Sequence, residues 1–115
     1  MPAPIHGRLA ALDVAGLASA AVSVYQVPAL RKATVGINIV NRSGSAAQMR
    51  LAITSGAIGT LADSDWLEFD ASLPAKEPLE RTGLTLRAGQ SVVIGNSGGT
   101  FPTVNCVVWG IEEDA

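Results

Sequence analysis

Apolar and polar residues alternate with a period of two along most of this chain, in short runs that are separated by turn residues. The segment 34–41 is the clearest case, because Val35, Ile37 and Ile39 share one face of it. Such alternation is typical of strands that bury one face. About seven or eight such runs, with turn signals roughly every 8 to 14 residues, predict an all-β fold, a single antiparallel β-sandwich or jelly-roll-like domain.

The turn residues also predict which strands pair. Residues 34–41 and 48–54 flank a turn rich in Asn, Ser and Gly, so we expect them to form a hairpin. Residues 84–86 and 91–94 flank a Gly-containing turn and predict a second hairpin. The segment 74–78 begins and ends with proline, which cannot continue a central strand, so it is expected to cross between sheets.

The N-terminal end is less regular. Residues 1–8 contain two prolines and little to bury, which predicts a short N-terminal arm, with residues 9–115 as the sandwich domain. For residues 9–16 the pattern leaves a strand and a loose helix open. The β-branched run that follows predicts a strand that ends at Pro28.

Composition indicates an unusual surface. Charged residues are 16% of the chain, against about 25% in ordinary soluble proteins. Hydrophobic residues are 48%, and aromatics are only 4%. A weakly charged, partly apolar surface is typical of a subunit that an assembly covers. The alternative is an Ala-rich monomer, since alanine raises the apolar count.

The charge pattern excludes some classes of partner. The net charge is −2, and Lys and Arg are scattered without a basic stripe, so no nucleic-acid partner is expected. The longest apolar run, 9–24, is interrupted by a charge and is shorter than the ~20 residues that a membrane span needs. No secretory signal is visible, and we expect synthesis in a cytoplasm. The single cysteine, Cys106, lies in an apolar run and is expected to be a packed thiol.

No catalytic residues are expected. The segment 95–99 resembles the Gly-rich loop around the serine nucleophile of chymotrypsin-like proteases. That chemistry needs a histidine base and an orienting aspartate. The single histidine is His6, in the expected arm, and the aspartate position of the loop holds Asn96. The sequence therefore predicts a Gly-rich loop around Ser97 and a protein that is not an enzyme.

No metal or cofactor is expected either. Asp63, Asp65, Glu68 and Asp70 supply oxygen ligands of the kind that calcium prefers, but their spacing lacks the glycine and distal glutamate of a calcium loop. One histidine and one cysteine cannot form a zinc site. These carboxylates are expected to face water or to form ion pairs between subunits.

The aromatic–acidic strand at 66–70 holds the main interface candidates. Alternation places Trp66 with the acidic residues on its outer face, and Leu67 and Phe69 on the other. An outward tryptophan predicts a binding contact, although packing on a neighbouring strand or on the rim of the sandwich stays open. The apolar residue of the arm is a further candidate. The predicted protein-interface residues are Ile5, Trp66, Glu68 and Asp70.

Five motifs in order resemble a family, the small β-domain structural proteins in the virions of tailed bacteriophages. They are Tyr25 to Ala29, Asn41-Arg42, Trp66 to Asp70, Leu79 to Gly83 and Val104 to Glu113. The resemblance covers roughly residues 20–113. The family often has a Gly-Lys turn after Pro-Ala, where this chain has Leu30-Arg31, so that turn is expected to differ.

The resemblance implies a virion structural protein with no catalytic residues. Its most concrete form is a capsid cement or decoration protein that binds the major capsid protein and stabilises the assembled shell. It also implies a homo-oligomer, possibly a trimer, located in the virion. The alternatives are a tail, neck, baseplate or fibre subunit with the same fold and, more remotely, a carbohydrate-binding β-sandwich module. The last usually needs several exposed aromatics, and this chain has few.

Overall fold

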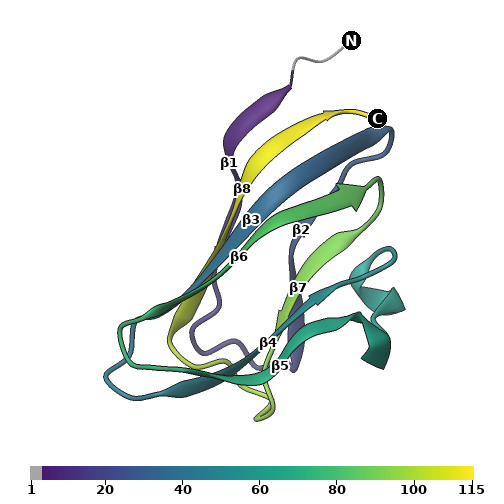
Figure 1. Cartoon of the computed structure of the whole chain (residues 1–115). Coiled ribbons are helices and arrows are strands. Elements are labelled where there is room, and N and C mark those ends of the chain that lie inside the picture. Colours follow the sequence, from purple (N-terminus) through teal and green to yellow (C-terminus); the bar gives the residue numbers. More distant parts are fainter. Residues whose placement is uncertain (1–3) are drawn as a thin grey trace.

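The computed structural model describes residues 4–115 and consists of two four-stranded antiparallel sheets (Figure 1). The first sheet has the order β1 (Ile5–Asp13), β8 (Val104–Asp114), β3 (Arg31–Asn41) and β6 (Pro78–Arg87). The second has the order β2 (Ala21–Gln26), β7 (Ser91–Gly95), β4 (Ala47–Ile53) and β5 (Trp66–Leu73). Two short 3₁₀ turns, η1 (Ile58–Thr60) and η2 (Asp63–Asp65), precede β5. The predicted all-β, antiparallel, jelly-roll-like sandwich is confirmed.

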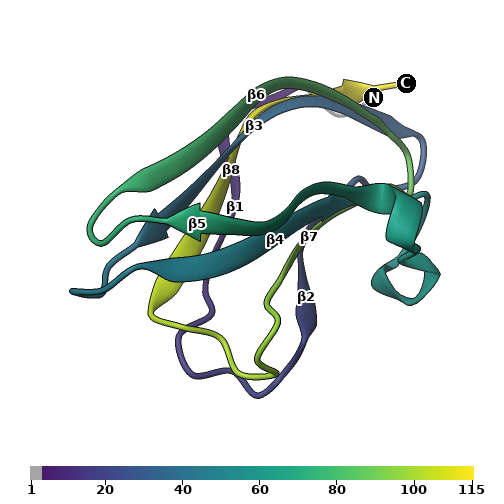
Figure 2. The ribbon, with the colours of Figure 1, turned by 60° about the horizontal axis from the view of Figure 1, so that its bottom comes forward.

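The core lies between the two sheets, which face each other as layers in Figure 2. Alternate residues of each inner strand point into it, as a period of two requires. From the first sheet come Val35, Ile37, Ile39, Cys106 and Val108, and from the second come Met49, Leu51, Val92 and Ile94. The predicted inward face of residues 34–41 is therefore confirmed.

The first predicted hairpin is wrong. β3 and β4 lie in different sheets, and β3 pairs with β8 and β6 instead. The turn between β3 and β4 is a corner that Asn41 holds. Its buried amide donates to the backbone oxygens of Ser45 and Leu73, at 2.8 and 3.0 Å. The same turn residues serve a hairpin and a corner, so local sequence could not separate the two.

The second predicted hairpin is wrong for the same reason. β6 belongs to the first sheet and β7 to the second, where β7 pairs with β2 and β4. The turn between them is held by the segment that follows β2, because the N–H of Gly89 donates to the carbonyl of Val27 at 2.9 Å. The predicted crossing at residues 74–78 is confirmed, since it joins β5 of the second sheet to β6 of the first.

The arm predicted over residues 1–8 is wrong for its second half. Residues 1–3 lie outside the described residues, but Ile5 already pairs with Glu112 in β1, which continues to Asp13. An edge strand needs one neighbour, and the side chains of β1 are mostly exposed, so little burial marks it in the sequence. Residues 9–13 are strand rather than helix, and β2 ends before Pro28 as predicted.

The two predicted faces of the 66–70 strand are partly wrong. β5 is an edge strand with two register shifts against β4, so its alternation is interrupted. Trp66 lies opposite Ala52 and Glu68 opposite Leu51, two adjacent residues whose side chains point to opposite faces. Trp66 and Glu68 therefore do not share a face. Phe69, expected to lie opposite the outer face, is 58% exposed.

Candidate interaction surfaces

Large hydrophobic side chains are exposed at several places on the described surface of the sandwich. Seven large hydrophobic side chains are exposed among residues 4–115: Ile5, Leu17, Leu30, Ile58, Leu67, Phe69 and Trp109. Leu30 is the most exposed of them, at 84%. These residues are spread over both sheets and over the loops at the two ends. They fit the weakly charged, partly apolar surface predicted from composition.

Leu30 lies in a tight turn between β2 and β3. The N–H of Arg31 donates to the carbonyl of Pro28 at 3.2 Å, which makes Leu30 the third residue of a β-turn. Its φ is 65°, a conformation that glycine adopts freely and leucine does not. A leucine there costs about 1–2 kcal/mol of backbone strain. The turn therefore has a backbone conformation that favours glycine, although leucine occupies it.

A shallow hollow of about 460 Å³ lies beside Leu30 at this end of the sandwich. Its lining comes from the β2–β3 and β6–β7 turns: Gln26, Val27, Pro28, Ala29, Leu30, Ala88 and Gly89. Backbone hydrogen bonds join the two turns, from Val27 to Gln90 and from Gly89 to Val27, each at 2.9 Å. The backbone N–H of Ala115 also donates to the carbonyl of Leu30 at 3.1 Å. The exposed leucine is thus presented from a well-anchored turn.

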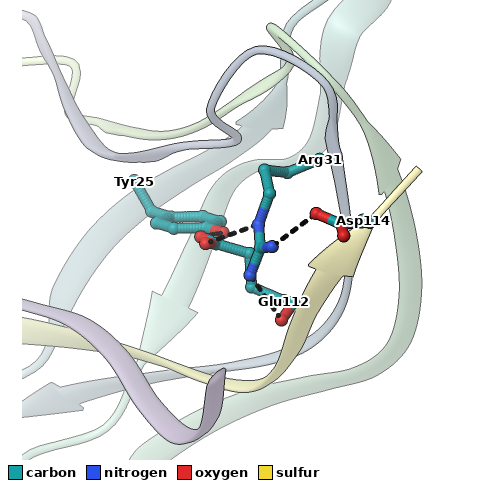
Figure 3. Close-up of polar contacts among 4 residues, drawn as sticks. All are labelled: Tyr25, Arg31, Glu112 and Asp114. Atoms are coloured by element: carbon teal, nitrogen blue, oxygen red, sulfur yellow. Dashed lines mark hydrogen bonds and ion pairs between the residues drawn. The ribbon is translucent and has the colours of Figure 1, made fainter. Parts of the chain in front are cut away.

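A buried polar network lies just beneath this turn (Figure 3). The hydroxyl of Tyr25 in β2 donates to Oε1 of Glu112 in β8 at 2.5 Å. Arg31 in β3 contacts Oε2 of Glu112 at 3.3 Å and Oδ1 of Asp114 at 2.8 Å. The network ties the second sheet to the first at one end of the core. Sequence reasoning missed it, although Tyr25 and Glu112 both lie in motifs that carry the resemblance.

The network makes the ionisation of Tyr25 unfavourable. Burial raises its pKa above the ordinary 10.0, and the hydrogen bond to Glu112 and the charge of that carboxylate raise it further, while Arg31 lowers it. Both effects of Glu112 act against a tyrosinate. A tyrosinate has no proton to donate to the carboxylate, and it would place a second negative charge beside it in a buried site.

We expect the single tyrosine of the chain to resist alkaline titration while the protein is folded. Its pKa is higher in the folded state, so the folded protein keeps a proton that the unfolded chain loses. The contribution of Tyr25 to the free energy of unfolding should be complete below pH 10.0 and should fall as the pH rises above it. Tyrosinate absorbance in native buffer and in denaturant measures both pKa values. A native titration that coincided with the denatured one would contradict the buried network.

The second sheet carries an aromatic cluster on its outer face. The guanidinium of Arg50 lies 3.8 Å from the ring centroid of Phe69. Arg50 also pairs with both carboxylate oxygens of Asp70, at 2.7 and 3.1 Å. The rings of Trp66 and Phe69 meet edge to face at 5.7 Å. The hydrogen bond from Arg50 holds the pKa of Asp70 below its usual value.

The four predicted interface residues fall in three places. Trp66 and Asp70 lie together around Arg50, and the half-buried indole of Trp66 packs against Gly95 of β7. Glu68 instead pairs with Arg81 of β6 at 2.9 Å and joins the two edge strands across the sandwich. Ile5 is 48% exposed, at the start of β1. Whether any of them contacts a partner stays a prediction.

Trp109 is an exposed aromatic that sequence reasoning did not assign to a surface. Its indole lies on Gly36 of β3, where any Cβ would clash with the ring. The ring lines an apolar hollow of about 490 Å³ on the outer face of the first sheet. Two features of the sequence could have indicated this position. Alternation with the buried Cys106 and Val108 directs the side chain of Trp109 outward. Gly36, a glycine between two β-branched residues, indicates that another group approaches the backbone closely there.

The motifs considered for chemistry are separated in the structure. His6 pairs with Ile111 late in β8, whereas Ser97 lies in the loop that precedes β8. In that loop the side chain of Asn96 bonds to backbone atoms of Ser19 and Gly98. The thiol of Cys106 is fully buried, as expected, and burial raises its pKa to about 12.

The acidic residues at 63–70 have individual partners or lie apart. Oδ2 of Asp65 accepts from the backbone N–H of Ala62, while Glu68 and Asp70 pair with different arginines. Over residues 4–115, no three His, Cys, Asp or Glu side chains are arranged to hold a metal ion. None of the helices within that range is long and apolar enough to cross a membrane.

Comparison with known proteins adds distant likenesses. No family model matches the chain, and none of the curated proteins does. Among solved structures it is similar to the coat protein of Tobacco streak virus, at 11% identity and a TM-score of 0.45, covering 100% of this chain and 89% of that one.

Two other solved structures share a lower similarity. The isomalto-dextranase of Arthrobacter globiformis T6 is 23% identical with a TM-score of 0.35, over 83% of this chain and 16% of that one. The catalytic domain of a GH87 α-1,3-glucanase is 11% identical with a TM-score of 0.35, over 90% of this chain and 21% of that one. This chain therefore spans only a small part of those two proteins. The fold itself rests on the strand pairing described above.

Proposed function

We propose that this protein is a structural protein of a tailed-phage virion, most concretely a capsid cement protein that binds and stabilises the assembled shell. The observation that carries the proposal is the set of seven exposed, large apolar side chains on a sandwich with few charges. In an assembled particle, neighbouring subunits would cover such side chains. The ordered motifs that resemble phage virion proteins support the same role.

The mechanism is binding, and it needs no reaction. A protein that binds the assembled lattice and not its free subunits stabilises the lattice by its binding free energy. Apolar side chains of the sandwich supply that energy when neighbouring shell subunits cover them. The two sheets, joined by a continuous core, keep these side chains in fixed positions. The partners in this proposal are further copies of the chain and the major capsid protein.

Particles made with and without the gene for this chain test the proposal. We expect particles without it to assemble but to release their DNA at a lower temperature, and added purified protein to restore the higher temperature. DNA release is followed with a dye that cannot enter intact shells. Equal release temperatures, or protein that does not bind the deficient particles, would contradict a cement role. A tail, neck, baseplate or fibre subunit would instead leave the shell unchanged and the tail defective.

The arrangement of aromatics favours assembly over the carbohydrate-binding alternative. The two exposed aromatic side chains in the described chain, Phe69 and Trp109, lie on different sheets. The half-buried Trp66 meets Phe69 edge to face, so these rings form no flat row on which successive sugar rings could stack.

A further inference from the structure

We propose that Leu30 is the anchor of a contact between copies of this chain, in which the leucine of one copy occupies the hollow beside Leu30 of the next. The inference rests on the self-association that is part of the proposed function, and it names the residue through which copies of the isolated protein meet. It rests on the conformation of the turn, on the shape of this end of the molecule and on its size.

The chain contains its own comparison for this turn. Residues 28–31 and 74–77 both begin with Pro-Ala, and in both the N–H of the fourth residue donates to the carbonyl of the first, at 3.2 Å. The third residues, Leu30 and Lys76, both have a φ of 65°. At Lys76 the position carries a charged, exposed side chain that suits water. At Leu30 the same backbone presents an apolar side chain to water.

Neither the turn nor the core accounts for a leucine at this position. Its side chain is 84% exposed, so it adds little to the core. Its φ is one that glycine adopts without strain. The isolated fold would therefore be at least as stable with glycine. A strained, exposed residue is evidence for a functional role when its surroundings hold it in place, and here hydrogen bonds anchor the backbone of the turn.

The shape of this end indicates a second copy as the occupant. Leu30 forms one wall of an apolar hollow of about 460 Å³, so each copy carries both the protruding leucine and the hollow. Copies that meet at this end around a rotation axis can use both, because each offers a leucine and accepts one, which gives a closed assembly. The anchored turn also loses little freedom on binding, and this favours association.

The size of the end sets the strength of the contact. The molecule measures 46 × 26 × 21 Å, so its end is much smaller than its faces. A contact over this end covers about 1,000 Å² in total, near the lower limit for specific interfaces. We therefore expect association in the micromolar range or weaker, visible when the protein concentration is varied.

Sedimentation velocity of the full chain from about 1 to about 200 µM tests the contact. The wild type should sediment faster as its concentration rises. Two variants should raise the dissociation constant at least tenfold while the melting temperature stays equal or rises. They are Leu30→Gly and Leu30→Lys, of which the second introduces the residue type found at position 76 of the matching turn. Leu17→Asn is the matched control, because Leu17 is 40% exposed but lies before β2, at the other end of that strand. It should associate like the wild type.

Three results would overturn the inference. The first is a wild type that stays monomeric over the whole range. The second is a Leu30 variant that associates like the wild type, or a Leu17→Asn variant that does not. The third is a marked drop in the melting temperature of both Leu30 variants, which would make the leucine a part of the fold. Because the experiment contains no particles, its failure would leave the cement proposal to its own test.

Discussion

Replacing Arg31 with methionine should lower the free energy of unfolding by about 3–5 kcal/mol, the usual loss when one partner of a buried ion pair is removed. Arg31 and Glu112 are each only 6% exposed. The substitution leaves the carboxylate of Glu112 buried without the guanidinium of Arg31, while the hydroxyl of Tyr25 stays bonded to it. Urea denaturation followed by tryptophan fluorescence measures the change.

Arg81→Met is the matched control for this substitution. Arg81 also forms an ion pair, with the carboxylate of Glu68, but its side chain is 39% exposed. An exposed pair of this kind contributes about 0–1 kcal/mol. If Arg81→Met destabilised the protein as much as Arg31→Met, burial of the network would not be the reason for its importance.

The second large effect is expected in the core. Leu51→Asp should prevent folding, because Leu51 is fully buried between the sheets and an unpaired carboxylate there costs several kcal/mol. That cost is comparable with the total stability of about 5–15 kcal/mol of a domain. Ile37→Asp, on the facing sheet, should do the same, since Ile37 is 1% exposed.

Leu67→Asp is the control that shows whether a charge prevents folding because it is buried in the core or because aspartate disrupts a strand. Leu67 lies in β5 at 37% exposure, so the variant should remain folded and soluble. Circular dichroism and thermal melting distinguish the outcomes. A Leu51→Asp protein that melted cooperatively near the wild-type temperature would show that this residue does not face the core.

Alternation predicted the fold class because it reports which side of each strand is buried. The buried Val35, Ile37 and Ile39 follow it without interruption. Strand partners were not predictable in the same way. A turn such as the one after Asn41 can reverse the chain within one sheet or carry it to the other, and the choice depends on distant strands such as β8.

The surfaces were predictable only in part for related reasons. Trp66 was found because tryptophan is rare in the chain, but its packing on Gly95 depends on two register shifts that leave no pattern in the sequence. In the sequence, Leu30 drew attention only as a departure from the Gly-Lys turn that the resemblance led us to expect. Its positive φ and its exposure became visible only with the turn in place. The network around Arg31 joins residues about 80 positions apart, beyond the reach of local patterns.

The most direct test of the central claim, that this chain is a structural subunit on an assembled shell, is a difference map between cryo-electron microscopy reconstructions of particles with and without its gene. The proposed function predicts extra density on the outer surface of the shell at junctions between subunits, into which the elongated sandwich of 46 × 26 × 21 Å fits. Two identical reconstructions of the whole particle would contradict it, as would difference density confined to the tail.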